Sequence, residues 1–365
     1  MISKALVVGA YHSKLDELAG RVGELSLIVP SAWGGLSLEK REGKGYQIYP
    51  LPIYFAGRNH FHFYRGIGGL FNKIKPDLVH IDEEHYSFVT YQVMKLAGRS
   101  GAKALFFTWQ NIRKQVPFPF SYFERFNFRN AGAALAGNQE AADILRIKGF
   151  KKNIYQIPQF GVDPEMFRKL DIAGLRKQIG IDDGDFVAGY MGRLVKEKGI
   201  DNLLEALKKL TPKVKLLLIG GGPYKKDLVE RIRHLDICGR VIMLDQVPSL
   251  DVPRYMNCMD CLVLPSLTMP NWKEQFGRVL IEAMACEVPV IGSSSGEIPV
   301  VIGDAGLIFQ EGNSSELLSN LELLVHDGVA RKRLAEKGRQ RVLIYYTQDV
   351  IAEATYKAYK QVLSL

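Results

Sequence analysis

The chain has 365 residues, 47% of them apolar and 24% charged, with a formal net charge of +9. This composition is typical of a soluble globular protein, and the length allows two domains with hydrophobic cores. No apolar run approaches the roughly 18–20 residues of a membrane span, and the start, MISKALVVGAYHSK, lacks the long apolar region of a signal peptide. Four cysteines do not make a disulfide framework, so we expect a cytoplasmic protein.

The first half of the sequence alternates short apolar runs with amphipathic segments. In chain order the pattern predicts strands at 5–9, 26–30, 78–81, 104–108, 133–136 and 154–157, and helices at 14–22, 86–98, 117–130 and 138–148. We expect Asn138 to cap the last of these helices. The turn residues GVDPEMF at 161–167 end the pattern.

The same alternation restarts in the second half. It predicts strands at 186–190, 215–219, 241–244 and 261–264, helices at 199–210, 224–235, 252–256 and 277–286, and then a further buried strand. Continuous Val, Ile and Leu runs that alternate with helices indicate parallel sheets covered on both faces. The fold class is therefore α/β, with two doubly wound, Rossmann-like domains. Because ligands of such sheets bind beyond the carboxyl ends of the strands, two facing domains would share a central cleft.

The excess of positive over negative charge lies entirely in the first half of the sequence. Residues 1–160 hold 21 Lys and Arg against 12 Asp and Glu, whereas residues 161–365 hold 27 of each kind. A basic half favours an anionic partner such as lipid headgroups, an acidic glycan or nucleic acid. The alternative is that the charge serves solubility alone.

Glycines and cations follow two strands of the second half. The loop after strand 186–190 reads MGRLVKEKG and contains Arg193 and Lys198, and the loop after strand 215–219 reads GGGP. Both lead into helices. Glycine lets backbone N–H groups approach a ligand, and helix N-termini favour anions, so a phosphate ester is the natural occupant of this sheet edge. Neither a Walker motif nor a dinucleotide fingerprint is present.

Two carboxylates lie beside a predicted buried helix in the same half. Helix 277–286 (GRVLIEAMAC) is apolar around its circumference, which is typical of a buried helix. Glu282 lies within it, and a buried carboxylate is costly unless a polar group comes to it. Glu274 lies just before the helix. We expect both acids and the first-turn N–H groups to point toward one place.

No metal site is expected. Cys258 and Cys261 form a C-x-x-C, but no second pair stands at a zinc spacing, so packing explains them better than metal or redox chemistry. No Asp-x-Asp follows a strand. The sequence predicts no cofactor.

Five spaced motifs carry a family resemblance: GRLVKEKG (192–199), LLLIGGGP (216–223), CLVLPS (261–266), EQFGRVLIEAMA (274–285) and VPVIGSSSGEIP (288–299). Together they resemble the donor-binding domain of retaining glycosyltransferases with the GT-B fold, glycosyltransferase family 4. The resemblance implies an acceptor-binding domain at 1–162 and a nucleotide-sugar-binding domain at 163–345. It also implies a C-terminal helix at 346–365 that crosses back to the first domain.

The resemblance also implies roles for individual residues. Arg193 and Lys198 would clamp the donor diphosphate, Glu274 would accept hydrogen bonds from the transferred sugar, and Glu282 would hold the ribose hydroxyls. The catalytic residues would be Arg193, Lys198 and Glu274, without any metal. The other donor-binding residues implied are Gly192, Gly221, Gly222, Val247, Phe276, Gly277, Arg278 and Val279.

Polar residues at strand ends of the first half are expected to serve the acceptor and the outer side of the sugar. They are Glu83, His85, Gln110 and Asn111. His85 is a candidate proton carrier, although a packed histidine is the commoner outcome. Gln110 stands where many relatives have His, and Gln cannot carry a proton.

These observations favour a retaining, metal-independent glycosyltransferase that moves a sugar from a nucleotide diphosphate sugar to a glycan, lipid-linked or small-molecule acceptor. Two alternatives remain open: a nucleotide-sugar epimerase of the same architecture, and a non-catalytic protein that binds an anionic surface. The basic first half, with RNHFHFYR at 58–65, suggests peripheral contact with an anionic membrane at its inner face. No nucleic-acid-binding motif is present.

Overall fold

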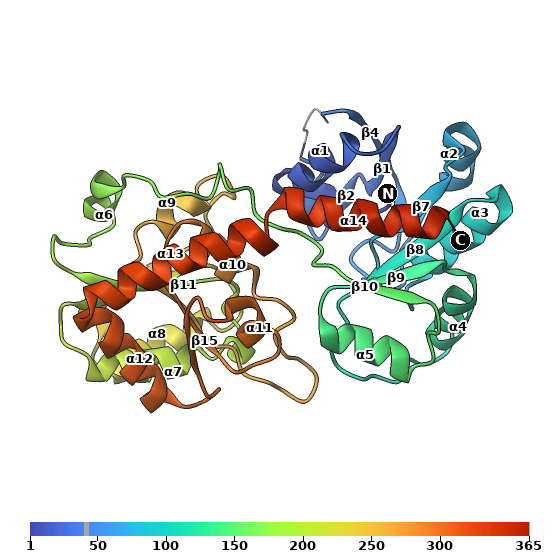
Figure 1. Ribbon diagram of the computed structural model, residues 1–365. Coiled ribbons are helices and arrows are strands. Elements are labelled where there is room, and N and C mark those ends of the chain that lie inside the picture. Colours follow the sequence, from blue (N-terminus) through green and yellow to red (C-terminus); the bar gives the residue numbers. More distant parts are fainter. Residues whose placement is uncertain (40–43, 365) are drawn as a thin grey trace. The chain divides into compact units, whose positions relative to one another are not determined.

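The computed structural model describes residues 1–39 and 44–364, which form two compact units. Unit 1 comprises Met1–Gly161 together with the last helix, α14 (Gln348–Leu363), and unit 2 comprises Val162–Thr347. Figure 1 shows α14 in red, running among the blue and cyan elements of unit 1. Each unit is an α/β structure built on a parallel sheet.

The strands of unit 1 are all parallel apart from two small hairpins. The strands of the parallel ladders are β1 (Leu25–Pro30), β4 (Tyr46–Leu51), β7 (Leu78–Ile81), β8 (Lys103–Thr108), β9 (Ala133–Ala136) and β10 (Asn153–Gln156). One hairpin pairs β2 (Ala32–Trp33) with β3 (Leu36–Ser37), and the other pairs β5 (Ile53–Tyr54) with β6 (Phe63–Tyr64). Strands β10-β9-β8-β7 form one ladder and β1-β4 another. Ile2 joins the two ladders through parallel bridges to Ile28 and Ile81.

The prediction of a first strand at 5–9 was wrong. Two 3₁₀ turns occupy this stretch, η1 (Ala5–Val7) and η2 (Gly9–His12). Ile2 holds the strand position instead, because its N–H donates to the carbonyl of His80 at 2.9 Å and its carbonyl accepts from the N–H of Asp82 at 2.8 Å. A short apolar run is buried equally well as strand or turn, so the apolar pattern alone did not distinguish the two.

The helices of unit 1 are α1 (Ser13–Ala19), α2 (Ile67–Ile74), α3 (Phe88–Ser100), α4 (Phe120–Asn130), α5 (Gln139–Ile147) and α14. Asn138 caps α5 as predicted, its side chain accepting from the N–H of Ala141 at 2.8 Å. Helix α14 packs against α1 and contributes Ile351, Ala352 and Val362 to the same hydrophobic core as β1 and β8. The last helix is therefore part of the core of unit 1.

Unit 2 contains six parallel strands in the order β13-β12-β11-β14-β15-β16. They are β11 (Phe186–Met191), β12 (Val214–Ile219), β13 (Val241–Leu244), β14 (Cys261–Leu264), β15 (Val290–Ser293) and β16 (Leu307–Phe309). The chain runs outward from β11 to β13 on one side, then returns to β14 beside β11 and runs outward to β16. The reversal makes the carboxyl ends of β11 and β14 the switch point, where doubly wound sheets bind ligands.

Helices surround this sheet. They are α6 (Ala173–Gln178), α7 (Ile200–Lys209), α8 (Lys225–His234), α9 (Val252–Met256), α10 (Arg278–Ala285), α11 (Ile298–Ile302), α12 (Ser314–His326) and α13 (Gly328–Tyr345), with 3₁₀ turns η3 (Lys196–Lys198) and η4 (Cys238–Arg240). Every strand and helix predicted in this half is present, with its ends shifted by a residue or two at most. Within the described residues, no helix is both long and apolar enough to cross a membrane.

Candidate functional site

The glycine loops at the switch point of unit 2 pack on each other. The N–H of Leu194 donates to the carbonyl of Gly221 at 2.9 Å, and the N–H of Gly192 donates to the carbonyl of Ile219 at 3.0 Å. A Cβ at Gly222 would lie 2.2 Å from the carbonyl oxygen of Leu194, so only glycine allows this approach. The predicted Gly192, Gly221 and Gly222 thus bring the ends of β11 and β12 together.

Lys198 and Glu274 meet at this edge of the sheet. The Nζ of Lys198 lies 2.6 Å from Oε2 of Glu274, and the two side chains are 17% and 9% exposed. The same carboxylate oxygen accepts a hydrogen bond from Oγ of Ser266, directly after β14, at 2.8 Å. A cation from the β11 side and a carboxylate from the β14 side therefore form one largely buried pair.

Backbone contacts fix the segments that carry this pair. Gly199 ends η3 in the left-handed conformation, and a Cβ there would lie 2.0 Å from the carbonyl oxygen of Pro265. The N–H of Leu267 donates to the carbonyl of Glu197 at 2.8 Å. On the other side, the N–H of Glu297 donates to the carbonyl of Glu274 at 3.2 Å. The backbone of both partners is held by neighbouring loops.

An aromatic ring faces the lysine of this pair. The Nζ of Lys198 lies 4.9 Å from the centroid of the Trp272 ring. Trp272 belongs to a tight turn in which its carbonyl accepts from the N–H of Met269 at 2.7 Å. Neither Trp272 nor Ser266 was predicted as a site residue, although Ser266 ends the CLVLPS motif.

Helix α10 is buried as predicted, and Glu282 is 7% exposed. The polar group that reaches Glu282 comes from its own helix, because Nε of Arg278 lies 2.7 Å from Oε1 of Glu282 one turn away. Gly277 precedes the helix in the left-handed conformation, where a Cβ would lie 2.8 Å from a methyl carbon of Leu264. Arg278 was expected to bind the donor, and its ion pair with Glu282 was not predicted.

The remaining predicted donor residues differ in exposure. Phe276 is buried with its ring 5.7 Å from that of Tyr346, whereas Val247 and Val279 are half-buried. Arg193 is exposed, and no hydrogen bond or ion pair among the described residues engages its guanidinium. Arg193 therefore shares the β11 loop with Lys198 without joining the Lys198–Glu274 pair.

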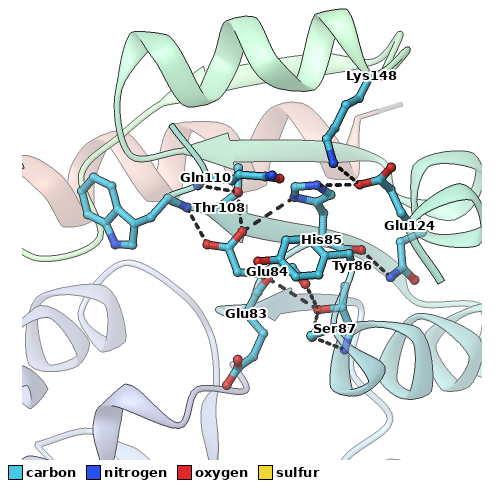
Figure 2. A network of polar contacts seen from close by, with 12 residues as sticks. Glu83, Glu84, His85, Tyr86, Ser87, Thr108, Gln110, Glu124 and Lys148 are labelled. Atoms are coloured by element: carbon cyan, nitrogen blue, oxygen red, sulfur yellow. Dashed lines mark hydrogen bonds and ion pairs between the residues drawn. The ribbon is translucent and has the colours of Figure 1, made fainter. Parts of the chain in front are cut away.

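The predicted acidic and histidine residues of unit 1 lie in a buried polar network at the carboxyl ends of β7 and β8 (Figure 2). Glu83 is 3% exposed and ion-paired with Lys4, and burial raises its pKa. His85 has no exposed surface, and its Nε2 lies 3.0 Å from Oε2 of Glu124. Burial alone would raise the pKa of Glu124, but hydrogen bonds from His85 and Lys148 outweigh burial and lower it. His85 is thus a packed histidine with a fixed carboxylate partner.

Glu84, which was not predicted as a site residue, connects β7 to β8 in this network. Its Oε2 accepts from Oγ1 of Thr108 at 2.6 Å, and its Oε1 accepts from the N–H of Trp109 at 2.9 Å. Thr108 in turn accepts from the N–H of Gln110 at 3.0 Å. Glu84 therefore positions the segment that carries Gln110 and Asn111, which are 7% and 5% exposed (Figure 2).

Two further features lie away from these residues. A cavity of about 530 Å³ opens at the amino-terminal ends of β1 and β7, the opposite edge of the unit 1 sheet, and none of the predicted site residues lines it.

Cys258 and Cys261 are buried free thiols whose pKa values burial raises. Within the described residues, no three His, Cys, Asp or Glu side chains gather closely enough to hold a metal ion.

Known structures identify the fold. A glycosyltransferase from Rickettsia africae superposes with a TM-score of 0.78 over 99% of this chain and 97% of its own, at 18% identity. HepE from Anabaena, solved with UDP and glucose, superposes with a TM-score of 0.77 over 100% and 98%, at 19% identity. Two parallel-sheet units arranged along the chain in this order define the GT-B fold of glycosyltransferases.

Sequence comparison finds relatives for the second half of the chain. The family model described as Glycosyl transferases group 1 matches residues 171–341, most of unit 2. N-acetyl-alpha-D-glucosaminyl L-malate synthase of Bacillus anthracis is 30% identical over 216 residues, which cover 58% of this chain and 55% of the relative. The capsular polysaccharide glycosyltransferase CapM of Staphylococcus aureus is 33% identical over 185 residues, 49% and 47%. The matches span about half the length of these curated relatives.

Proposed function

We propose that this protein is a retaining, metal-independent glycosyltransferase of family 4, which moves a sugar from a nucleotide diphosphate sugar to a glycan, lipid-linked or small-molecule acceptor. One observation carries the proposal: the buried ion pair of Lys198 and Glu274 at the switch point of a group 1 domain, where Nζ and Oε2 lie 2.6 Å apart. The pair places a cation that can bind phosphate next to a carboxylate that can accept hydrogen bonds from sugar hydroxyls.

The charges at this edge suit cleavage of a sugar–diphosphate bond. Negative charge develops on the leaving diphosphate and positive charge on the anomeric carbon. Lys198, the exposed Arg193 and the N–H groups that begin α10 would stabilise the leaving diphosphate. Such fixed cations and dipoles need no metal ion.

The two acids have separate roles in this proposal. Glu274 would accept hydrogen bonds from the transferred sugar, with Ser266 as its neighbouring donor. Glu282 would bind the ribose hydroxyls while Arg278 balances its charge. Each carboxylate is engaged by its own cation, so we do not propose them as the paired acid and nucleophile of a retaining glycosidase.

Unit 1 would serve the acceptor. Gln110 and Asn111 follow β8 and are held by the Glu84–Thr108 network, which suits hydrogen bonds to hydroxyl groups. His85 suits proton transfer less well, because it has no exposed surface and its Nε2 faces Glu124. We therefore propose His85 as a structural residue.

We also propose a cytoplasmic protein that contacts an anionic membrane through unit 1. Large aromatic side chains are exposed there, with Phe118 at 81% and Phe55 at 50%. The sequence excess of Lys and Arg over Asp and Glu lies in residues 1–160. Sedimentation with liposomes, with and without anionic lipid, tests this. Equal pelleting with both would contradict an electrostatic attraction.

Related proteins suggest which donors to try first. HepE was solved with UDP and with UDP-glucose, and a Corynebacterium glutamicum relative is named as GDP-mannose-dependent. A thermal-shift screen with UDP, GDP, ADP and dTDP identifies the base, since a ligand that binds only the folded protein raises its melting temperature.

The decisive test is sugar transfer by purified full-length protein with candidate donors and acceptors. Lys198→Ala and Glu274→Ala should each lower the transfer rate by about 100-fold or more, as expected for loss of a preorganised electrostatic contact. Asp304→Asn, which removes an exposed ion pair with Lys337, is the charge-matched control for Glu274→Ala and should transfer normally. Undiminished transfer by both alanine variants would contradict the proposed site.

The same incubation separates the alternatives. A donor epimerised at unchanged mass without acceptor would indicate the epimerase. Nucleotide-independent liposome binding with no turnover would indicate the non-catalytic binding protein.

A further inference from the structure

The cation proposed for the donor phosphate is already engaged by a carboxylate. Lys198 and Glu274 are 17% and 9% exposed, and their charged atoms lie 2.6 Å apart. Pairing at this distance in a water-poor site offsets much of each charge. The Trp272 ring, 4.9 Å from Nζ, faces the ammonium without offsetting its charge. A diphosphate that approaches Lys198 therefore meets a cation whose charge is largely compensated.

A bare nucleoside diphosphate would have to displace Glu274 from Lys198. The displaced carboxylate would keep the hydroxyl of Ser266 at 2.8 Å but lose its charged partner. It would also lie near at least two negative phosphates. Removing a charged hydrogen-bond partner from a buried group costs more than removing a neutral one. The nucleotide alone brings no donor to replace the ammonium.

A nucleotide sugar brings the missing donors on the same molecule. Its sugar hydroxyls can donate to Glu274 at the moment when its phosphates take Lys198. Only the side chains need to exchange partners, because the backbone of Glu274 is held by the N–H of Glu297 at 3.2 Å. A Cβ at Gly296 would lie 2.0 Å from the carbonyl oxygen of Glu274, so the backbones of these two segments pack directly on each other.

We propose that the Lys198–Glu274 pair makes the site select nucleotide sugars over bare nucleoside diphosphates. This inference rests on the proposed function and adds a specificity mechanism to it. The pair opens fully only for a ligand that supplies anionic oxygens to Lys198 and hydroxyl donors to Glu274 together. Once the sugar has left, Glu274 competes for Lys198 again and weakens the hold on the nucleoside diphosphate.

The test uses the full chain and isothermal titration calorimetry. The nucleoside diphosphate that gives the largest thermal shift is titrated first, then its sugar ester: UDP-glucose, GDP-mannose, ADP-glucose or dTDP-glucose. Glu274→Gln should bind the bare diphosphate about tenfold tighter than the unchanged chain, because Lys198 is released from its charged partner. The same variant should bind the sugar ester no tighter. Asp304→Asn should change neither affinity.

A double-mutant cycle separates competition for Lys198 from simple repulsion between Glu274 and phosphate. In a Lys198→Gln background, Glu274→Gln should alter diphosphate affinity by less than about twofold, since no cation remains to be released. A full tenfold gain in that background would assign the effect to repulsion and overturn the proposal. If Glu274→Gln does not fold, Glu274→Asp, which withdraws the carboxylate from Lys198, should tighten diphosphate binding in the same sense.

The outcomes also separate this proposal from the proposed function. If no diphosphate or sugar ester binds the unchanged chain, the proposed donor site fails and the selection with it. If both ligands bind, and Glu274→Gln weakens both equally, the donor site stands and the selection is refuted. Opposite changes for the two ligands support the selection, because a purely structural role for Glu274 would shift both in one direction.

Discussion

Nε of Arg278 and Oε1 of Glu282 lie 2.7 Å apart, one turn from each other on α10. The arginine side chain is 36% exposed and the glutamate side chain 9% exposed. The pair therefore joins a carboxylate in the buried interior of unit 2 to a cation that reaches solvent. This contact explains how an otherwise apolar buried helix tolerates a carboxylate before any ligand reaches it.

Arg278→Ala should lower the free energy of unfolding by about 1–3 kcal/mol, because Glu282 would lose its charged partner. Urea denaturation measures the change. Arg278→Lys, which keeps a cation four residues before the acid, should recover part of the loss. Equal stability of the alanine variant and the unchanged chain would show that Glu282 is satisfied by other groups.

Gly296→Ala should destabilise unit 2 by more than about 1 kcal/mol. Gly296 has a φ of +55°, and the added Cβ would lie 2.0 Å from the carbonyl oxygen of Glu274. The substitution should also weaken nucleotide-sugar binding, since it displaces the backbone of Glu274. Gly174→Ala in α6 is the matched control, because no atom lies within 4 Å of its new Cβ. Thermal unfolding and calorimetric titration of both variants check the prediction.

Trp272→Ala should weaken nucleotide-sugar binding about three- to tenfold, because the ring 4.9 Å from Nζ of Lys198 helps to hold the ammonium in place. Trp272→Phe keeps an aromatic face and should retain most of the affinity. Calorimetric titration gives the affinities, and circular dichroism checks that both variants fold. Equal losses for Phe and Ala would show that the size of the indole, and not its aromatic face, matters.

His62 should make unit 1 less stable in acid. Its ring has no exposed surface and lies 4.5 Å from that of Trp33, and neither ring nitrogen has a hydrogen-bond partner in the described part of the chain. Burial, with a smaller contribution from Lys4, lowers its pKa to about 4. Between pH 6.5 and about 4 the unfolded chain binds a proton that the folded chain does not. The free energy of unfolding therefore falls by up to about 3 kcal/mol as the pH drops through this range.

Comparison with His62→Phe isolates this contribution. The variant should match the unchanged chain near pH 7, where the histidine is neutral, and lose less stability on acidification. Glu83 acts in the opposite sense, since burial raises its pKa. Its Oε1 lies 3.8 Å from Nε2 of His62, so both proteins are compared in a Glu83→Gln background. Urea midpoints at several pH values between 4.5 and 7 provide the measurement. Parallel curves for the two proteins would refute the assignment.

The sheet of unit 2 was predictable because its strands are short, mostly apolar runs, such as LLLI at 216–219. Strand β4 (Tyr46–Leu51) was not, because YQIYPL mixes polar residues and a proline into the run. The stretch 5–9 misled for the opposite reason. This stretch is apolar enough to form a strand. Ile2, however, already bridges β1 and β7, and Ala5–Val7 form a 3₁₀ turn.

The motifs were enough to select the residues of the proposed donor site, but not to show which side chains they contact. The motifs place Lys198 and Glu274 at the ends of neighbouring strands, yet a distance of 2.6 Å depends on how two loops pack in space. Arg278 and Glu282 were readable in principle, since their spacing is that of a helical ion pair. His85 was ambiguous, because sequence gives no measure of the burial that encloses it.

Because α14 belongs to unit 1 but follows unit 2 in the chain, unit 1 is completed by the last residues to be synthesised. Unit 2 is one uninterrupted stretch of chain, whereas unit 1 needs Ile351, Ala352 and Val362 from beyond it to complete its core. During synthesis, residues 1–161 therefore emerge with an exposed apolar surface that stays uncovered until the whole of unit 2 has left the ribosome. Unit 1 can therefore complete its core only after all of unit 2 has been synthesised.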